Sequence, residues 1–332
     1  MRDVAALAGV SVKTVSRVVN NEPSVSADVA GRVQAAVSTL GYRHHLAASN
    51  LRRSAQRTGT VAALLQDLSN AYSANVLHAI EVAAAERDVA VVASSLDEEP
   101  ERERELVEGL VRRRVDGLVL MPATLSQDYL RPDLEAGLVA VFVDRRPHGI
   151  RADSVTVDGD RGAALATEHL LAHGHRRVAF LSDVLRIETA RARYAGFERA
   201  MAARGLAAEP RHVVTGLRSA QEAARAVTDL LDSDDPPTAI FAARNSVAEG
   251  AVRALHARGA AHRTALVAFD DIPMADVLQP GLTVVRQDLD AIGAQVVGRL
   301  FARLDGDTSP PRALELDVEL VVRGSGEIRP RR

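Results

Sequence analysis

Hydrophobic and polar residues repeat with two different periods along this chain, and the change falls near residue 60. Before that point, apolar side chains recur at helical spacing over three short stretches. After it, short apolar runs alternate with helical stretches of about ten to fifteen residues, such as 72–88 and 189–205. The runs are VAALLQD (61–67), VAVVASS (89–95), GLVLMPA (117–123), LVAVFVD (138–144), RVAFLSD (177–183), TAIFAAR (238–244), TALVAFD (264–270) and LTVVRQD (282–288). This alternation predicts a small all-α head followed by an α/β body of two doubly wound parallel-sheet subdomains.

The stretch before residue 60 predicts three short helices. Asp3 is expected to cap the first, and Gly9 to end it in a tight turn. The second is expected over residues 12–19 with Ser11 as its cap, and the third begins after Ser26. On the second helix the inward side chains are Val15, Val18 and Val19, and the outward ones are Lys13, Thr14, Ser16 and Arg17.

A helix, a glycine turn and a second helix with a polar N-terminal half form a helix-turn-helix pattern. It suits DNA because a helix fits the major groove while its first side chains meet base edges. A small packing bundle is the alternative that the pattern alone leaves open. Residues 1–58 carry eight Lys/Arg against three Asp/Glu, a net charge of +5, whereas the remainder carries 33 against 41, or −8. A basic head on an acidic body favours a polyanionic partner for the head, with chance variation as the alternative.

Composition excludes several classes of protein. The chain has no cysteine, which excludes disulfides, thiolate metal sites and a thiol nucleophile. Its apolar runs are too short for a membrane span, and the N-terminus lacks the apolar region of a secretory signal. We therefore expect a cytoplasmic protein that does not bind membranes. The first expected helix begins almost at Met1, which leaves open whether native residues precede it.

The sequence offers little for catalysis. His169 and His173 stand at the i, i+4 spacing of some zinc sites, but no glutamate follows His169 as in HExxH. There is no P-loop, no GxGxxG after a strand and no GxSxG elbow. Asp270 and Asp271 form an acidic pair, which ligand binding explains better than catalysis does. We expect no metal, no cofactor and no enzymatic activity.

Polar residues end most of the predicted strands. Open parallel sheets bind ligands at the carboxyl ends of their strands, so these residues predict a cleft between the subdomains. The residues are Asp67, Ser94, Pro122, Asp144, Asp183, Arg244, Asp270 and Asp288. As a set they favour a receptor for a hydroxyl-rich or charged small molecule, although any one of them could be inert.

The head resembles a known family. The stretch RDVAALAGVSVKTVSRVVNN…VS…RVQAAVSTLGY is similar to the N-terminal signature of the LacI/GalR family of bacterial transcriptional repressors. The resemblance implies that one set of side chains reads base edges and another faces phosphates. The base-reading set is Val12, Lys13 and Arg17, and the phosphate-facing set is Thr14, Ser16 and Asn20.

The linker, residues 44–58, has two interpretations. Its short helical pattern, roughly 46–53, is not stable alone in water, so a flexible tether is one alternative. The family resemblance implies a hinge helix that forms on operator DNA, with Ala48 on the side that faces the duplex. Leu51 would then enter the minor groove and kink the DNA. His44 and His45 stand where the family usually has Pro-Asn, which leaves the start of this helix open.

The body also resembles the family, and with it the periplasmic sugar-binding fold. The matching stretches are QDLSNAYSANV, TARARYAGF and VAFDD. They imply effector contacts from Tyr72, Ser73, Asp144, Thr189, Arg193 and Asp270. The chain departs from the family at Arg244, where a polar Asn or Asp is usual, and at Arg218, where an aromatic residue commonly stacks on the sugar. With Arg193 these arginines favour an anionic effector, unless Arg218 or Arg244 pairs with Asp270 or Asp144 or points to solvent.

Together these observations predict a ligand-responsive repressor of sugar or related carbon-source genes that binds a pseudo-palindromic operator as a homodimer. The expected domains are a helix-turn-helix head (1–43), a hinge (44–58) and a core (59–332). Within the core we expect an N-subdomain of residues 59–158 and 289–316 and a C-subdomain of residues 159–288 and 317–330. A sugar-binding receptor without a DNA role and a sugar-converting α/β enzyme remain the alternatives.

Overall fold

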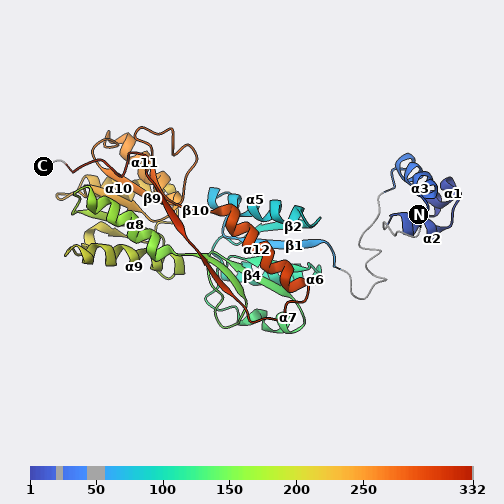
Figure 1. Cartoon of the computed structure of the whole chain (residues 1–332). Coiled ribbons are helices and arrows are strands. Elements are labelled where there is room, and N and C mark those ends of the chain that lie inside the picture. The colour runs from blue at the N-terminus through green and yellow to red at the C-terminus, as the bar shows by residue number, and fades with distance from the viewer. Residues whose placement is uncertain (20–24, 43–56, 331–332) are drawn as a thin grey trace. The chain divides into compact units, whose positions relative to one another are not determined.

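The computed structural model describes residues 1–19, 25–42 and 57–330. It divides into two compact units, residues 1–58 and residues 59–332 (Figure 1). Each unit has its own hydrophobic core. Among the described residues no helix is both long and apolar enough to cross a membrane.

The first unit contains three helices, α1 (Arg2–Ala8), α2 (Val12–Val19) and α3 (Ala27–Thr39). Gly9 ends α1 in the left-handed conformation, and the Ser11 hydroxyl accepts a hydrogen bond from the Thr14 backbone N–H at 3.1 Å, as the sequence predicts. The expectation for Asp3 is wrong. Because α1 already begins at Arg2, Asp3 lies in its first turn and cannot cap it. The inward side chains Val4, Val15 and Val33 are almost completely buried and hold the three helices together.

The second unit contains two six-stranded sheets, each in a lobe of its own (Figure 1). The first lobe has strand order β11-β5-β4-β3-β1-β2, and the second has β12-β10-β9-β8-β6-β7. All strand pairs are parallel except β10 with β12. The strands of the first lobe are β1 (Thr60–Leu65), β2 (Ala90–Ser95), β3 (Gly117–Leu120), β4 (Val139–Val143), β5 (Asp153–Val157) and β11 (Ala313–Leu316). Those of the second lobe are β6 (Val178–Leu181), β7 (Val213–Val214), β8 (Ala239–Ala242), β9 (Ala265–Phe269), β10 (Thr283–Gln287) and β12 (Val318–Val321).

Helices cover both sheets. The first lobe has α5 (Ala71–Ala85), α6 (Pro100–Arg112), the short η1 (Asp128–Leu130), α7 (Arg131–Glu135) and α12 (Leu289–Leu304). The second has α8 (Gly159–Ala172), α9 (Glu188–Ala203), the short η2 (Pro210–His212), α10 (Ala220–Leu231) and α11 (Asn245–Ala257). The chain crosses between the lobes after β5, after β10 and after β11, so that α12 and β11 return to the first lobe and β12 completes the second.

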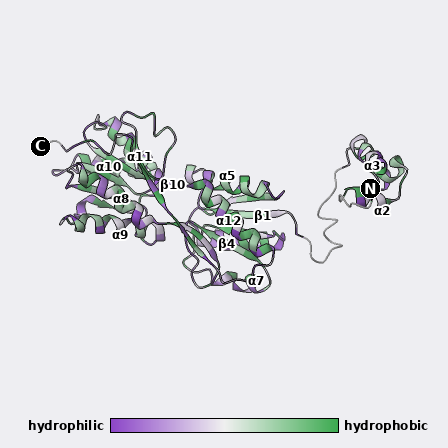
Figure 2. Ribbon diagram, in the orientation of Figure 1, coloured by the Kyte–Doolittle hydropathy of each residue, from purple (hydrophilic) through white to green (hydrophobic). Residues whose placement is uncertain are grey.

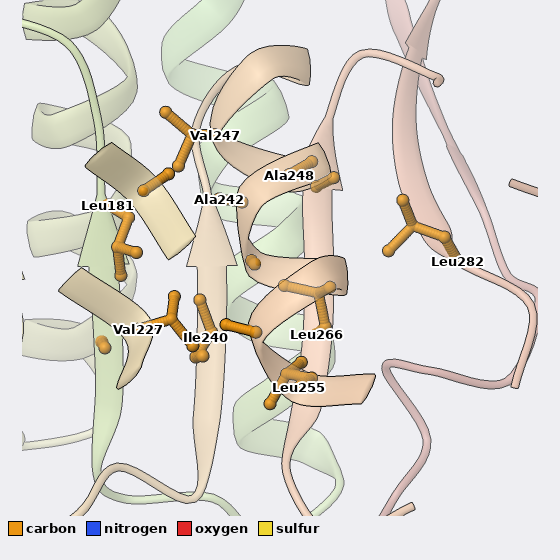
Figure 3. Packing of buried hydrophobic residues seen from close by; sticks show 14 of the residues in the cluster. Leu181, Val227, Ile240, Ala242, Val247, Ala248, Leu255, Leu266 and Leu282 are labelled. Atoms are coloured by element: carbon orange, nitrogen blue, oxygen red, sulfur yellow. The ribbon is translucent and has the colours of Figure 1, made fainter. Parts of the chain in front are cut away.

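The cores lie between the sheets and their helices. In the second lobe, Ile240 of β8 and Leu266 of β9 pack against Leu255 of α11 (Figure 3). Figure 2 shows hydrophobic and hydrophilic residues alternating along the covering helices, as expected where one face is buried. Full burial of a side chain such as Ile240 stabilises the fold by about 1.5–3 kcal/mol. The sheets are thereby held rigidly enough to position the loops at their strand ends.

Candidate functional sites

The exposed face of α2 is the candidate DNA-reading surface. Val12 is 42% exposed and Lys13 is also exposed, whereas Val15 and Val18 face the core. Ser16 and Arg17 are half-buried, so their accessible atoms lie at the edge of this face. An exposed apolar side chain beside a cation suits the thymine methyl group and the acceptors of guanine. Asn20, Ala48 and Leu51, which the sequence adds to this surface, lie outside the described residues.

The second unit contains a small pocket between its lobes, where strand ends of both sheets meet. Its free volume is about 40 Å³, enough for a few water molecules, so a sugar-sized ligand requires side chains or lobes to move apart. The pocket is lined by Gln66, Asn70, Tyr72, Asp144, Arg145, Ser182, Asp183, Ile187, Thr189, Ala190, Arg193, Ala243, Arg244, Asn245 and Asp270. Eight of these fifteen residues lie within two positions of the ends of β1, β4, β6, β8 or β9, which is where parallel sheets place ligands.

Asp144 and Asp270 occupy corresponding positions in the two lobes. Each follows a buried strand and has a left-handed backbone, with φ of 67° and 70°. Such a conformation is strained in a residue with a side chain, and strain of this kind gathers at binding sites. Asp270 accepts a hydrogen bond of 2.5 Å from the Gln287 amide. Burial raises the pKa of Asp270 above its usual value, although the nearby Arg193 opposes the shift.

Tyr72 connects Asp144 to Gln287, the residue that donates to Asp270. Its hydroxyl lies 3.1 Å from an Asp144 carboxylate oxygen and 3.2 Å from the Gln287 side-chain oxygen, and either oxygen can accept its hydrogen bond. Burial and the charges of Asp144 and Asp270 hold the pKa of Tyr72 well above its usual value. Tyr72 therefore stays protonated and provides a hydroxyl donor that a ligand can use in place of Asp144.

Each aspartate of the pocket has an arginine partner. Arg244 forms an ion pair with Asp183, Arg193 lies 3.7 Å from Asp270, and Arg145 lies 3.6 Å from Asp144. The sequence left open whether Arg244 pairs with Asp270 or Asp144, and its partner is instead Asp183 at the end of β6. Charge inside the pocket is thus balanced, as expected for a site that binds a neutral, hydroxyl-rich molecule.

Arg193 is held from two sides. Its Nη1 donates to the carbonyl of Ala243 at 2.8 Å, and its guanidinium carbon lies 3.6 Å from the centre of the Phe269 ring. Its Nε, like the hydroxyl of Ser182, is buried and has no hydrogen-bond partner among the described residues. Buried polar groups are rarely left unpaired, so these two groups offer hydrogen bonds to a ligand in the pocket.

Two asparagines connect the lobes across the pocket. Asn70 caps α5 in the first lobe, and Asn245 begins α11 in the second. The Asn70 amide donates to the Asn245 oxygen at 3.1 Å, and the Asn245 amide donates back at 2.8 Å. These paired bonds exist only while the lobes are close together.

The structure brings together most, but not all, of the effector residues that the sequence names. Tyr72, Asp144, Thr189, Arg193, Arg244 and Asp270 line the pocket. Ser73 does not, because the third position of α5 turns its side chain into the interior, where it is fully buried. Arg218 does not either: it is exposed before α10, and its backbone N–H bonds the Glu222 carboxylate at 2.7 Å.

Several lining residues escaped the sequence analysis. Arg145 and Asn245 directly follow the predicted Asp144 and Arg244, so their position next to a strand end was a usable signal. Asn70 had a weaker signal as a helix cap. Of the other predicted strand-end residues, Asp183 lines the pocket, whereas Asp67, Ser94, Pro122 and Asp288 do not.

The histidines at the end of α8 have structural partners. His169 contacts Glu327, and His175 bonds the Thr238 hydroxyl at 2.9 Å and the Ile328 carbonyl at 2.7 Å. No group of three or more potential ligands that could hold a metal occurs within the described ranges. His169 and His175 therefore attach the C-terminal segment to the second lobe.

Known proteins match the chain over almost its whole length. The profile of bacterial regulatory proteins, lacI family, matches residues 1–44, and that of the periplasmic binding protein-like domain matches residues 167–326. The transcriptional regulator PtxS of Pseudomonas plecoglossicida is 33% identical, covering 98% of this chain and 95% of its own. The crystal structure of the Lac repressor dimer bound to operator and the anti-inducer ONPF has a TM-score of 0.84 at 29% identity, with 98% of both chains covered. A complex of the transcriptional regulator CelR with cellobiose has a TM-score of 0.72 at 30% identity, covering 97% of this chain and 98% of its own.

Proposed function

The chain belongs to the LacI family of bacterial regulatory proteins, and on that premise we propose that it is a repressor which a sugar-like effector releases from a pseudo-palindromic operator. It is a ligand-responsive, DNA-binding regulator of transcription. The relatives that it matches are regulators and not enzymes, so the receptor and enzyme alternatives are set aside. Because its target is chromosomal DNA, we place its action in the cytoplasm.

The observation that best supports a sugar-like effector is the balanced pocket between the lobes. Its aspartates can accept hydrogen bonds from ligand hydroxyls, and Arg193 and Ser182 offer buried polar atoms without hydrogen-bond partners. Because Asp144, Asp183 and Asp270 are already neutralised by arginines, a neutral polyol fits the pocket without leaving an unpaired charge. The similar regulator CelR was solved with cellobiose, which has the same chemistry.

In the head we assign Val12, Lys13 and Arg17 to base edges. Thr14, Ser16 and Asn20 would contact phosphates. Residues 44–58 would form the hinge on operator DNA, where Leu51 enters the minor groove beside Ala48 and unstacks a base step. We keep the boundaries of the head (1–43), the hinge (44–58) and the core (59–332).

A homodimer would place two such heads on one operator. On the first lobe, Val82 of α5 and Val92 of β2 are about half exposed, at 53% and 46%, and their two elements pack together. We propose that this apolar surface forms the dimer contact. The two α2 helices would then lie in successive major grooves, roughly 34–36 Å apart. Movement of the lobes around the effector would change this contact and with it the spacing of the heads.

The test separates the two sites. Operator affinity of the full chain is measured with and without a panel of neutral sugars, for the wild type, Asp270→Asn and Leu51→Ala. We expect an active sugar to weaken wild-type operator binding by about 5- to 150-fold. Asp270→Asn should bind operator normally but ignore the sugar, whereas Leu51→Ala should bind the sugar normally and lose a few kcal/mol of operator binding. An Asp270→Asn variant that responds like the wild type would contradict the proposed pocket.

A further inference from the structure

Lys13 carries the only side-chain amine in the chain. The sequence has 41 lysine and arginine residues, and all the others are arginines. The two side chains differ in their chemistry as well as in their shape. A lysine amine loses its proton readily enough to act as a nucleophile and accept an acyl group, whereas an arginine stays protonated. Stable acylation of side-chain amines is therefore limited to Lys13, and only the terminal amine reacts beside it.

The surroundings of Lys13 leave its amine accessible. Lys13 is the second residue of α2 and is exposed, whereas Val15, two positions later, is buried. The first turn of α2 contains no acidic residue, and the Lys13 amine makes no hydrogen bond or ion pair with any described residue. By contrast, Arg32 on α3 lies 3.6 Å from the carboxylate of Asp28. A small electrophile can reach the Lys13 amine without displacing a partner.

The fold does not depend on the charge of Lys13. A cation in the first turn of a helix is unfavourable because that end carries a partial positive charge. Arg17 follows one turn later, and like charges at this spacing repel each other. The helix is held instead by the buried Val15 and by the Ser11 hydroxyl, which accepts the Thr14 N–H. Neutralisation of Lys13 should therefore leave α2 folded.

The remaining cations of the head keep its general attraction to DNA. Residues 1–58 contain seven arginines besides Lys13, and acylation of the lysine lowers their net charge only from +5 to +4. Non-specific binding follows the number of phosphates that the protein neutralises, so it changes little. A contact between a lysine and a base edge, however, is lost when the ammonium is replaced. Acylation of Lys13 thus separates sequence reading from general attraction.

We propose that Lys13 is an acylation site, and that transfer of an acyl group from an acyl phosphate to its amine switches off the reading of operator DNA. The inference rests on the proposed function, in which Lys13 contacts a base edge. The neutral amine attacks the carbonyl carbon, a C–N bond forms and the C–O bond to phosphate breaks. Phosphate leaves with the bonding electron pair, and the proton of the amine passes to water. The product is a neutral amide with one N–H donor, where the ammonium had three.

An acyl phosphate is the donor that the site favours. The amine of Lys13 is open to solvent, so a small activated acyl group needs only to collide with it. A thioester of coenzyme A is much larger and is the natural comparison, because it carries the same acyl group.

The test treats the full chain with acetyl phosphate, acetyl coenzyme A or inorganic phosphate and follows modification of Lys13 by mass spectrometry. Affinity is then measured for the duplex that the untreated wild type selects from a randomised pool, and for a duplex of unrelated sequence. We expect acetyl phosphate to weaken binding of the selected duplex by about 5- to 150-fold for each modified head. Binding of the unrelated duplex should change by less than about twofold.

Two variants isolate the effect of the lysine. Lys13→Arg keeps a cation that cannot be acylated, so treatment should leave its affinity unchanged although its terminal amine still reacts. Lys13→Gln carries a neutral amide and should bind the selected duplex as weakly as the treated wild type does. Circular dichroism of the treated wild type should show unchanged helix content, and a loss of helix would contradict the argument that the fold tolerates the modification.

The other outcomes are decisive as well. Lys13 that acetyl phosphate does not modify would overturn the proposal, and modification by acetyl coenzyme A alone would overturn the choice of donor. An equal loss of affinity in treated Lys13→Arg would assign the effect to the terminal amine. A wild type that selects a duplex and binds it equally well after modification contradicts the switch alone, whereas a wild type that selects no duplex contradicts the proposed function.

Discussion

Lys13 is the only lysine in the chain. The other 40 of the chain's 41 lysine and arginine residues are arginines. It stands on the exposed first turn of α2, next to Val12. A lysine is a compact point charge that can donate to the two acceptors of guanine without the fixed fork of an arginine. Its position fits the reading of a base edge better than it fits general attraction to DNA.

Replacement of Lys13 tests this role. We expect Lys13→Ala to relax the base preference at one position in each half-site, at a cost of about 1–3 kcal/mol there. The measurement is a set of operator affinities in which each base pair is changed in turn. Arg32→Ala, which removes an exposed cation from α3, is the control and should leave the base preference unchanged. Equal weakening on all sequences would instead identify Lys13 as a phosphate contact.

The same uniqueness allows a test without mutation. Mild acetylation modifies the side-chain amine of Lys13 and, apart from it, only the terminal amine. Saturating operator should protect Lys13 from acetylation, as followed by mass spectrometry. Equal modification with and without operator would show that Lys13 does not lie at the DNA.

At the scale of elements, α12 carries two glycines with opposite surroundings. A Cβ added at Gly293 would lie 2.6 Å from the backbone and side chain of Ala79 on α5, whereas one at Gly298 would meet nothing within 4 Å. We expect Gly293→Ala to destabilise the fold by about 1–3 kcal/mol, because α5 and α12 must separate. Gly298→Ala should stabilise it by up to about 1 kcal/mol through helix propensity. Urea unfolding of both variants measures these changes in the free energy of unfolding. Equal changes in the two variants would contradict the close packing of α5 on α12.

His175 makes stability depend on pH. It is 1% exposed, and burial lowers its pKa below the usual 6.5. The folded protein therefore binds a proton less readily than the unfolded chain does. The contribution of His175 to the free energy of unfolding should be constant above about pH 7. It should fall as the pH is lowered through 6.5, by at most about 1.4 kcal/mol per pH unit.

The pH dependence is measured by urea unfolding between pH 7 and 5. The variant His175→Gln should be less stable at pH 7 but show a smaller loss on acidification. His262→Gln, at an exposed position, should keep the wild-type slope. If the free energy of unfolding of His175→Gln falls with pH as steeply as that of the wild type, the acid sensitivity belongs to other groups.

The elements themselves were largely predictable, and the exceptions have physical causes. All eight apolar runs became strands, because strands buried on both faces are continuously hydrophobic. β11 and β12 were missed because each lies at a sheet edge and is partly exposed, so glutamates interrupt their apolar pattern. β5 is buried but rich in Asp, Ser and Thr, since Asp153 pairs there with Arg299 and Arg303 of α12. No local pattern reveals such partners, which are more than a hundred residues away.

At the scale of the whole molecule, the pocket depends on contacts that sequence patterns could not predict. Strand-end residues were expected at the cleft, and Asp144, Arg244 and Asp270 are there. Arg218, whose expected place came from the family pattern, does not line the pocket in this structure, where its backbone N–H bonds the Glu222 carboxylate. The pairing of Asn70 with Asn245 joins residues 175 positions apart, and only the fold brings them together.

This asparagine pair should influence the balance between open and closed lobes. Loss of its two hydrogen bonds in Asn245→Ala should cost the closed form about 1–3 kcal/mol. Effector affinity should then fall about 5- to 150-fold, because closure would cost more. Asn75→Ala, an exposed site on α5, is the control. Calorimetric titration with an active sugar provides the comparison, and unchanged affinity in Asn245→Ala would show that the pair does not stabilise closure.

The most direct measurement is selection of bound sequences from a randomised DNA pool by the full chain at physiological salt. An effector-released repressor should retain a two-fold symmetric site with a flexible central step and lose it when an active sugar is added. Retention of unselected sequences alone, under every condition, would contradict the assignment of α2 as a reader of operator DNA.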